Sequence, residues 1–324
     1  MKKGRVIRAS ALLLLLVFCA AAGGTAVSGM ERQSQYRVAM VVKSTQSAFW
    51  QSVFAGARAA GTEYNVELTF AGPESEEDYR TQNEMIDQAV ADGAQAIVFS
   101  AVDFDANAEA VNRAAAAGVR IVVIDSDVNS TAVEIRIGTD NYEAGRMAGR
   151  AALAAPDEEL YVGIVNFDAK TANGQQREQG FRDALEAEER VAELQTINVR
   201  SATEDAREAT AAFLRENPEI NVIATFNEWT SLGVGWAIRD LGLKDSTCVV
   251  AFDSNVVCVG MLERGELDAL IVQNPYAMGY LGVEAAFRLL AGAAPAQTEV
   301  DTETTLVNRE NMFEEEYQKI LFGF

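Results

Sequence analysis

Hydrophobic residues along the chain follow two alternating patterns. Short runs of β-branched residues, such as residues 37–43 and 121–124, are followed by longer segments in which apolar residues recur every three or four positions. The short runs are typical of buried strands, and the longer segments are typical of amphipathic helices. The run at 121–124 contains only Ile and Val, so both of its faces need covering, as in a parallel sheet. The pattern therefore predicts the α/β class.

The alternation forms two series, separated where Thr139, Asp140 and Asn141 interrupt the pattern before a helix at 142–154. We place a domain crossing there, and two doubly wound parallel sheets with right-handed crossovers fit the length. The first series has strands at 37–43, 66–71, 96–100 and 121–124, and helices at 47–60, between a capping box at Ser75 and Gly93, and at 105–117. The second has strands at 161–167, 194–199, 222–226, 248–252 and 269–272, and helices at 175–186, 204–215, 230–241 and 256–264.

The first 22 residues predict an export signal. Four basic residues precede an apolar run at 11–22, which is typical of a secretory signal and too short for a membrane span. Cys19 follows Leu-Val-Phe, which resembles the lipidation site of bacterial lipoproteins, although Phe18 stands where a small residue is expected. Lipidation at Cys19 and soluble release after Ala22 therefore both stay open.

Composition narrows the function classes. The chain has 324 residues, of which 49% are hydrophobic, enough for one large core or two smaller ones. Its 27 Lys and Arg against 48 Asp and Glu give a net charge of −21, which would repel nucleic acid. It has no histidine, so Ser-His-Asp catalysis, Cys-His catalysis and His-ligated zinc are excluded. Cys248 and Cys258 fall in apolar segments and are expected to be buried free thiols.

Polar residues end the predicted strands. In open parallel sheets, ligands bind beyond the carboxyl ends of the strands. The first strand is not followed by a Gly-rich loop, which disfavours dinucleotide binding. The residues at the strand ends are Lys43, Ser100, Asp125, Asp168, Asn227, Asp253 and Gln273.

These residue types suit a neutral, polyhydroxylated ligand. Carboxylates accept hydroxyl protons, amides donate and accept, and an aromatic face such as that of Phe49 or Trp50 covers the C–H side of a ring. Three or four charge-assisted hydrogen bonds with one aromatic contact amount to about −8 kcal/mol, a micromolar Kd. Each residue alone also has a structural explanation, because a strand-end Asp often caps a helix. The set predicts a sugar site without a catalytic group or a cofactor.

Seven motifs, in order over nearly the whole mature chain, resemble the ribose-, galactose- and rhamnose-type periplasmic binding proteins, the substrate receptors of sugar ABC transporters. They are Ser-Ala-Phe-Trp at 47–50, Ile-Asp-Ser-Asp at 124–127, Thr-Asp-Asn-Tyr-Glu-Ala-Gly at 139–145, Arg-Glu-Gln-Gly-Phe at 177–181, Phe-Asn-Glu at 226–228, Ala-Phe-Asp at 251–253 and Gln-Asn-Pro-Tyr-Ala-Met-Gly-Tyr at 273–280.

The resemblance implies the type I periplasmic binding protein fold, in which two α/β lobes joined by three crossings trap a ligand between them. The implied crossings lie near 139/140, 273/274 and 305, and a helix at 277–291 returns to the first lobe. The implied function is that of a monomeric receptor, periplasmic or extracellular, that delivers a small sugar or polyol to an ABC permease and its ATPase. The implied parts are a signal peptide at 1–22, an N-terminal lobe of 35–139 plus 274–305, and a C-terminal lobe and tail of 140–273 plus 306–324.

The resemblance also assigns roles to single residues. It matches Phe49 and Trp50 to the family's aromatic sandwich, and it matches five residues to its polar contacts. Those five are Ser47, Asp125, Asn227, Asp253 and Gln273.

Two arginines of the family pattern are replaced, one by Ser126 and one in the far lobe by Gln175. An unpaired buried carboxylate is costly, so Asp125 and Asp253 need another compensating group, and we expect Lys43 to supply it. Asp-Ser-Asp with Lys43 also resembles the autoinducer-2 and rhamnose receptors, which leaves a signalling receptor as the alternative. An amino-bearing ligand would also suit two free carboxylates.

Two further classes have less support. A lac-repressor-type regulator with this architecture needs a helix-turn-helix before the first strand, where this chain has an export signal. An enzyme would use Asp125 and Asp253 as an acid/base pair, but no nucleophile elbow, phosphate loop or metal set accompanies them in the sequence. We therefore expect a binding protein and not an enzyme.

Overall fold

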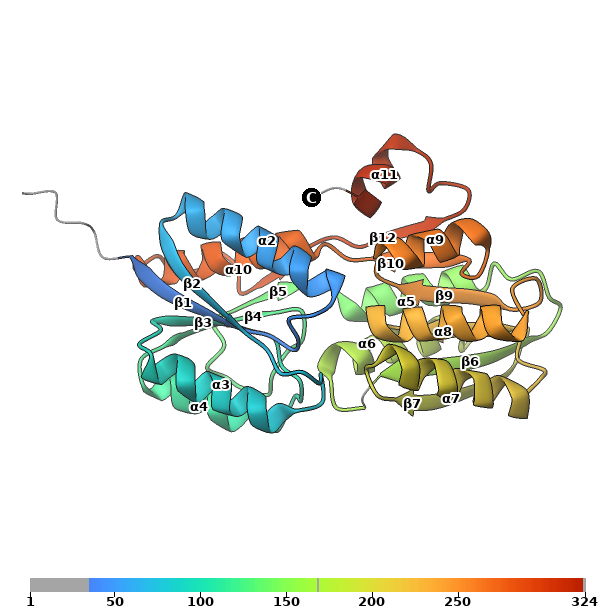
Figure 1. Ribbon diagram of the computed structural model, residues 1–324, viewed down its shortest axis with the longest axis horizontal. Coiled ribbons are helices and arrows are strands. Elements are labelled where there is room, and N and C mark those ends of the chain that lie inside the picture. Colours follow the sequence, from blue (N-terminus) through green and yellow to red (C-terminus); the bar gives the residue numbers. More distant parts are fainter. Residues whose placement is uncertain (1–34, 168, 323–324) are drawn as a thin grey trace, which may run out of the picture. The chain divides into compact units, whose positions relative to one another are not determined.

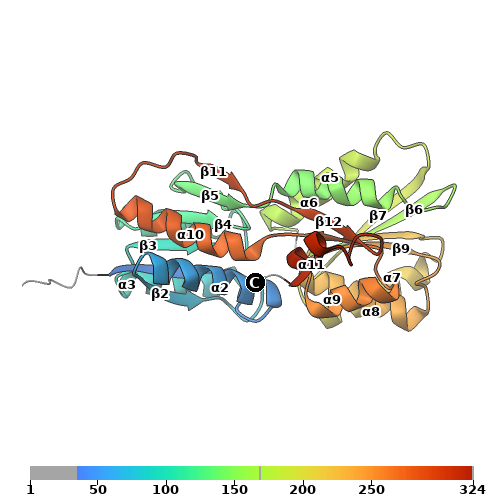
Figure 2. The same ribbon diagram turned by 90° about the horizontal axis from the view of Figure 1, so that it is seen from above.

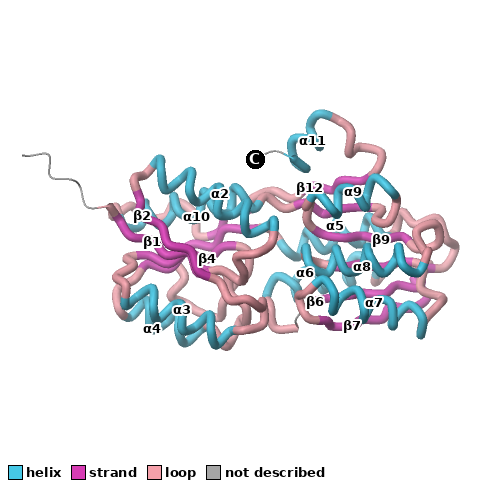
Figure 3. Tube along the Cα trace, viewed as in Figure 1, coloured by secondary structure: helices cyan, strands magenta, loops and turns pink. Residues whose placement is uncertain are grey.

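The computed structural model describes residues 35–167 and 169–322. The predicted export signal, Cys19 and Asp168 lie outside the described residues. Within the described ranges, no helix has the length and apolar character needed to cross a membrane. Helices and strands alternate along these ranges, as Figure 3 shows.

The described residues form two six-stranded sheets, and the first sheet defines the N-terminal lobe. The strand order is β11-β5-β4-β3-β1-β2, and all neighbouring strands of this sheet are parallel. Helices α2 and α10 cover one face, and α3 and α4 cover the other (Figure 1). The elements are β1 (Tyr36–Val41), α2 (Ala48–Glu63), β2 (Val66–Ala71), α3 (Tyr79–Ala91), β3 (Ala96–Phe99), α4 (Ala108–Ala116), β4 (Arg120–Ile124), β5 (Ile135–Gly138), α10 (Pro275–Leu290) and β11 (Glu299–Asp301).

The second sheet defines the C-terminal lobe. Its strand order is β12-β10-β9-β8-β6-β7, and β12 runs antiparallel to β10. Helices α5 and α6 cover one face, and α7, α8, α9 and α11 pack on the other (Figure 2). The elements are α5 (Asn141–Ala152), β6 (Leu160–Phe167), α6 (Ala172–Leu185), β7 (Val191–Val199), α7 (Thr203–Glu216), β8 (Val222–Thr225), α8 (Glu228–Leu241), β9 (Cys248–Phe252), α9 (Val256–Arg264), β10 (Ala269–Val272), β12 (Thr305–Asn308) and α11 (Glu315–Phe322).

Within the described residues, the chain passes between the two sheets three times. The first passage follows β5 at residues 139–140, and the second follows β10 at residues 273–274. The third, at residues 302–304, joins β11 to β12. Because α10 lies between the second and third passages, a helix late in the sequence completes the N-terminal lobe.

Glycine lets the two helices that follow the first and second passages, α5 and α10, approach neighbouring helices closely. A Cβ atom on Gly145 of α5 would lie 2.1 Å from the carbonyl oxygen of Arg177 in α6. Helices α5 and α6 therefore approach each other closely at this glycine. In the N-terminal lobe, a Cβ atom on Gly279 of α10 would lie 1.8 Å from the carbonyl oxygen of Val53 in α2.

Most helix starts differ from the sequence prediction by a few residues, and at two of them an acidic side chain explains the difference. Asp78, and not Ser75, caps α3, because its carboxylate accepts the N–H of Thr81 at 3.0 Å. Helix α4 begins at Ala108 instead of residue 105, since the Asp103 carboxylate accepts the N–H groups of Asp105 and Ala106 in the preceding turn. In both cases a short acidic side chain binds the backbone locally and sets the start.

The two cysteines within the described residues are free, as expected. Cys258 is buried and Cys248 is half-buried. Burial raises the pKa of the Cys248 thiol to about 12 and raises that of Cys258 as well, so both remain protonated at neutral pH.

We predict that Gly279→Ala destabilises the protein by about 1–3 kcal/mol, because the new methyl group must push α10 away from α2. Gly260→Ala in α9 is the matched control, since its Cβ would meet only the end of the flexible Arg264 side chain at 3.1 Å. That control is expected to be neutral or to stabilise by less than about 1 kcal/mol. Urea unfolding of both variants would contradict this account if they lost the same free energy.

Candidate ligand-binding site

A small cavity lies where the carboxyl ends of strands from both sheets meet. Its volume is about 30 Å³, room for about one water molecule. Ten residues were selected from the sequence, all of them within the described ranges, and eight of the ten line this cavity. Its lining consists of Lys43, Ser47, Phe49, Trp50, Glu76, Asp125, Asn173, Arg177, Asn227, Glu228, Trp229, Asp253 and Gln273.

Asp125 and Asp253 follow the last residues of β4 and β9. Both have left-handed backbone conformations, with φ of 57° and 69°. Few residues other than glycine adopt this conformation, and such strain concentrates at functional sites. Asp125 accepts hydrogen bonds from Ser100 Oγ at 2.9 Å and, across the lobes, from Asn173 Nδ2 at 3.1 Å.

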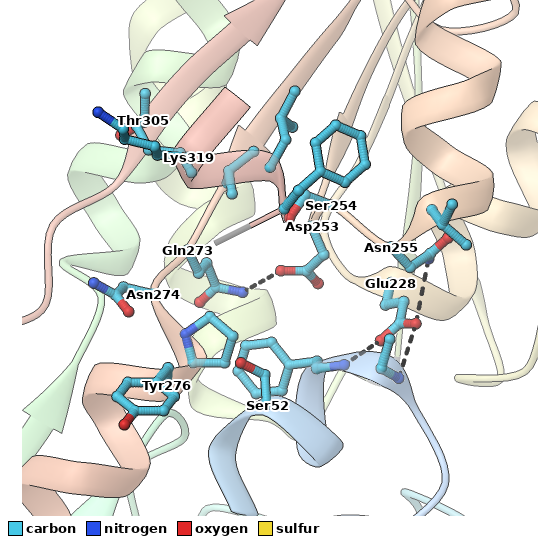
Figure 4. A pocket seen from close by; sticks show the side chains of 18 of the residues that line it. Ser52, Glu228, Asp253, Ser254, Asn255, Gln273, Asn274, Tyr276, Thr305 and Lys319 are labelled. Atoms are coloured by element: carbon cyan, nitrogen blue, oxygen red, sulfur yellow. Dashed lines mark hydrogen bonds between the residues drawn. The ribbon is translucent and has the colours of Figure 1, made fainter. Parts of the chain in front are cut away.

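Asp253 is almost fully buried. Its Oδ1 accepts a hydrogen bond from Gln273 Nε2 at 2.8 Å, a contact drawn in Figure 4. Burial raises the pKa of Asp253 from 3.8 to about 7, although the positive charge of Arg177 and the Gln273 hydrogen bond oppose the rise. Near neutral pH both the acid and the carboxylate form of this group are therefore populated.

Arg177 of α6 provides a guanidinium beside the two aspartates. It is 1% exposed, and it donates to Asn141 Oδ1 at 2.8 Å and to Gln273 Oε1 at 2.6 Å. A third bond reaches the carbonyl of Phe226 at 2.7 Å. Burial lowers the pKa of Arg177, and the charges of Asp125 and Asp253 counteract this effect.

The expectation that Gln175 holds the far-lobe position is corrected by this arrangement. Gln175 is exposed and lines a different cavity with Asp103 and Lys170. Residues two positions apart on a helix point about 200° apart, so when Arg177 faces the aspartates, Gln175 faces away. Arg177, which belongs to a motif noted in the sequence, supplies a guanidinium to the cavity from this lobe.

Ser126 also lies outside the cavity lining. It is fully buried, and its Oγ has no hydrogen-bond partner among the described residues. Its N–H donates to Ser100 Oγ at 3.3 Å, so the residue supports the turn that carries Asp125.

Lys43 makes its ion pair with Glu76 and with neither aspartate. Its Nζ lies 3.6 Å from Glu76 Oε2 and 4.9 Å from the ring centre of Phe167 in the other lobe. Glu76 also accepts hydrogen bonds from Trp50 Nε1 at 3.1 Å and from Ser201 Oγ at 2.8 Å. Glu76 therefore neutralises Lys43, and the expected compensation of the aspartates comes from Arg177.

Ser47 and Asn227 line the cavity and also cap helices. Ser47 Oγ accepts the N–H of Trp50 at 3.3 Å at the start of α2. Asn227 Oδ1 accepts the N–H of Thr230 at 2.9 Å at the start of α8, and its Nδ2 donates to Ser201 Oγ at 2.7 Å. Each side chain is thus fixed in position by its own helix.

The aromatic residues are arranged differently from a sandwich built by two neighbours. Phe49 and Trp50 meet edge to face, with ring centres 5.1 Å apart and planes at 87°. Trp50 is 2% exposed and packs in the core, whereas Phe49 is half-buried. Trp229 lines the cavity from the other lobe, so aromatic side chains of both lobes border it.

A larger cavity of about 510 Å³ adjoins the first one (Figure 4). The two cavities share Phe49, Glu228, Asp253 and Gln273 in their linings. The larger cavity is also lined by Lys319 and its neighbours in α11. The sequence predicts this segment only as part of the C-terminal tail.

A family model described as a periplasmic binding protein domain matches residues 38–294. The D-ribose/D-allose-binding protein of Pseudomonas aeruginosa is 28% identical over 279 residues, which cover 82% of this chain and 85% of that protein. The ribose import binding protein of Bacillus subtilis is 24% identical, over 84% of this chain and 87% of that protein.

Solved structures of transporter solute binding proteins are also similar to this chain. A carbohydrate transporter solute binding protein from Agrobacterium radiobacter, in complex with D-arabinose, is 31% identical with a TM-score of 0.84, over 89% of this chain and 99% of that one. An ABC transporter solute binding protein from Agrobacterium vitis, with bound D-fucose, is 29% identical with a TM-score of 0.84, over 88% of this chain and 100% of that one.

We predict that Asp253→Asn makes the protein more stable relative to wild type as pH rises. The folded state of the wild type holds the Asp253 proton up to about pH 7, while the unfolded chain releases it near 3.8. The contribution of this group to the unfolding free energy therefore falls by roughly 1.4 kcal/mol per pH unit between these values and then levels off.

Urea unfolding at pH 5, 6, 7 and 8 measures this difference. Asp245→Asn, at an exposed turn position, is the control and is expected to show no such trend. A difference between Asp253→Asn and wild type that stays constant from pH 5 to 7 would contradict the raised pKa.

Proposed function

The chain belongs to the periplasmic binding protein family, and from that premise we propose that it captures a small sugar or polyol between its lobes and delivers it to an ABC importer. The relatives and solved structures named above are substrate-binding transport proteins and not enzymes. The proposed lobes comprise residues 35–139 plus 274–305, and 140–273 plus 306–324. Each contains one of the two sheets, except that Thr305, the first residue of β12, falls in the first lobe.

The observation that carries this proposal is the meeting of Asp125, Asp253 and Gln273 in one cavity beside Phe49. Sugar hydroxyl groups both donate and accept hydrogen bonds, and these carboxylate and amide groups complement them. The C–H face of a sugar ring is apolar and packs on an aromatic ring such as that of Phe49. These contacts need no catalytic group and no cofactor.

The ligand is proposed to replace hydrogen bonds that the protein makes with itself. The cavity holds about one water molecule, so a sugar requires the lobes to separate and the Asn173–Asp125 contact to break. Asp125 then becomes free to accept a hydrogen bond from a sugar hydroxyl group, and Asn173 becomes free to donate a hydrogen bond to a hydroxyl oxygen. The cost of opening reduces the net affinity.

The proposed setting follows from the family and from the leader. We propose that the mature protein acts as a monomer in the periplasm or outside the cell, with a permease and its ATPase as partners. The predicted signal at 1–22 supports export. Whether the protein is anchored by a lipid on Cys19 or released after Ala22 is decided by mass measurement of the mature N-terminus.

A receptor for an autoinducer-2-like signal or a chemotaxis ligand is the second candidate. The observation that favours it is Lys43, which lines the cavity as in the resemblance noted from the sequence. Against it stands Asp127, the second aspartate of the Asp-Ser-Asp motif. Asp127 binds Arg136 at 2.9 Å and does not line the cavity.

Calorimetric titration with D-ribose, D-allose, D-arabinose, D-fucose and the autoinducer tests this function. We expect a micromolar or tighter Kd for at least one of the sugars. Asp125→Asn is expected to weaken that sugar at least about tenfold, because a charged hydrogen bond to a hydroxyl is lost. Asp127→Asn, from the same motif, is the matched control and should change the affinity less than about twofold.

Binding of the autoinducer with no heat from any sugar would replace the first candidate with the second. An equal loss of affinity in Asp125→Asn and Asp127→Asn would show that the sugar binds elsewhere.

A further inference from the structure

Three helix starts converge on the carboxylate of Glu228. This residue is the first of α8 in the C-terminal lobe. Its Oε1 and Oε2 accept the N–H groups of Ala48 at 3.2 Å and Phe49 at 3.0 Å, which begin α2 in the N-terminal lobe. Its Oε1 also accepts a hydrogen bond of 3.2 Å from Nδ2 of Asn255, and Asn255 caps α9 (Figure 4).

Glu228 completes the cap of α2 from the other lobe. The first N–H groups of a helix have no partner within the helix. Ser47 accepts only the N–H of Trp50, so the N–H groups of Ala48 and Phe49 depend on Glu228. A helix start also carries a positive partial charge, roughly half an elementary charge. The starts of α2 and α8 would repel each other here without a negative charge between them.

The burial of Glu228 makes this contact stronger than a surface ion pair. Glu228 is 6% exposed, and an ionised acceptor bound to backbone N–H groups forms a charge-assisted hydrogen bond. By contrast, the pair between Arg200 and Glu77, which also joins the two lobes at 3.3 Å, has an Arg200 side chain that is 64% exposed. Exposed pairs of this kind contribute little.

Other buried bonds between the lobes involve side chains of the proposed sugar site. Asn173 donates to Asp125, and Ser201 donates to Glu76. A sugar would compete for Asp125, Asn173 and Glu76, because these side chains line the small cavity, as the carboxylate of Glu228 also does. The partners of Glu228 in α2 are backbone N–H groups whose direction the helix fixes, so they remain available while a ligand is bound.

We propose that Glu228 is a positioning residue that stabilises the closed arrangement of the lobes. It bonds to α2 only when the lobes are together, and it fixes the helix turn that carries Phe49 into the cavity. The effect on sugar release rests on the proposed function, whereas the effect on closure does not.

Small-angle X-ray scattering of the unliganded protein tests closure directly. Glu228→Ala removes every acceptor, and Glu228→Gln keeps the shape but loses the charge. We expect a larger radius of gyration for both variants than for wild type, with the greater increase for Glu228→Ala. Glu77→Gln is the matched control, and we expect it to scatter as wild type does.

Stopped-flow kinetics with the tightest sugar of the titration gives the second readout. We expect Glu228→Gln to raise koff about tenfold, as the loss of a charged hydrogen bond would, with kon changed less than about twofold. If Glu228 had a merely structural role, its substitution would lower the melting temperature without raising koff relative to kon. If Glu228→Ala does not fold, Glu228→Gln decides.

Scattering of Glu228→Gln identical to wild type, or an equal expansion in Glu77→Gln, would overturn the proposal. If the Glu228 variants expand but no sugar binds to any form, closure by Glu228 stands and the proposed function fails.

Discussion

The buried guanidinium of Arg177 is the group around which the rest of the site is organised. A charge removed from water is tolerated only when hydrogen bonds and opposite charges surround it. Here Asn141 and Gln273 supply side-chain acceptors, and Asp125 and Asp253 supply the negative charge. Asn141 follows the first passage between the lobes and Gln273 lies in the second, so one side chain links the site to both. Thr139 strengthens the link by donating to Gln273 Oε1 at 2.9 Å.

Helix packing determines where that guanidinium lies. A Cβ on Gly145 would meet the carbonyl oxygen of Arg177 at 2.1 Å, and a Cβ on Gly180 would meet that of Tyr142 at 2.0 Å. Helices α5 and α6 therefore touch along their backbones, which brings Arg177 to the ends of the central strands. The same face of α6 carries Asn173 to Asp125 in the opposite lobe. Small residues in one helix thus control the contacts of charged residues in the next.

Strands and cavity residues that depend on local pattern were predictable from the sequence. Strands β2, β9 and β10 have the predicted limits. Strands β9 and β10 are continuous apolar runs between polar residues, and β2 alternates apolar Val66, Leu68 and Phe70 with other residues. Strands β5, β11 and β12 were not predicted, since they have three or four residues each and gain their pairing from distant strands. Five of the seven strand-end side chains line the small cavity, because parallel topology places those ends together. Glu76, Asn173 and Glu228 were not found, because they lie in a loop or at helix starts, where only the folded chain fixes their direction.

The central claim is that a hydroxyl-rich ligand is held between the lobes by Asp125, Asp253 and Gln273. The most direct measurement is a crystal structure of the protein with the sugar that binds most tightly. The account predicts sugar hydroxyl groups within hydrogen-bonding distance of all three side chains, with the ring of Phe49 against the sugar. A sugar found only in the larger cavity beside α11, with Asp125 still bonded to Asn173, would contradict it.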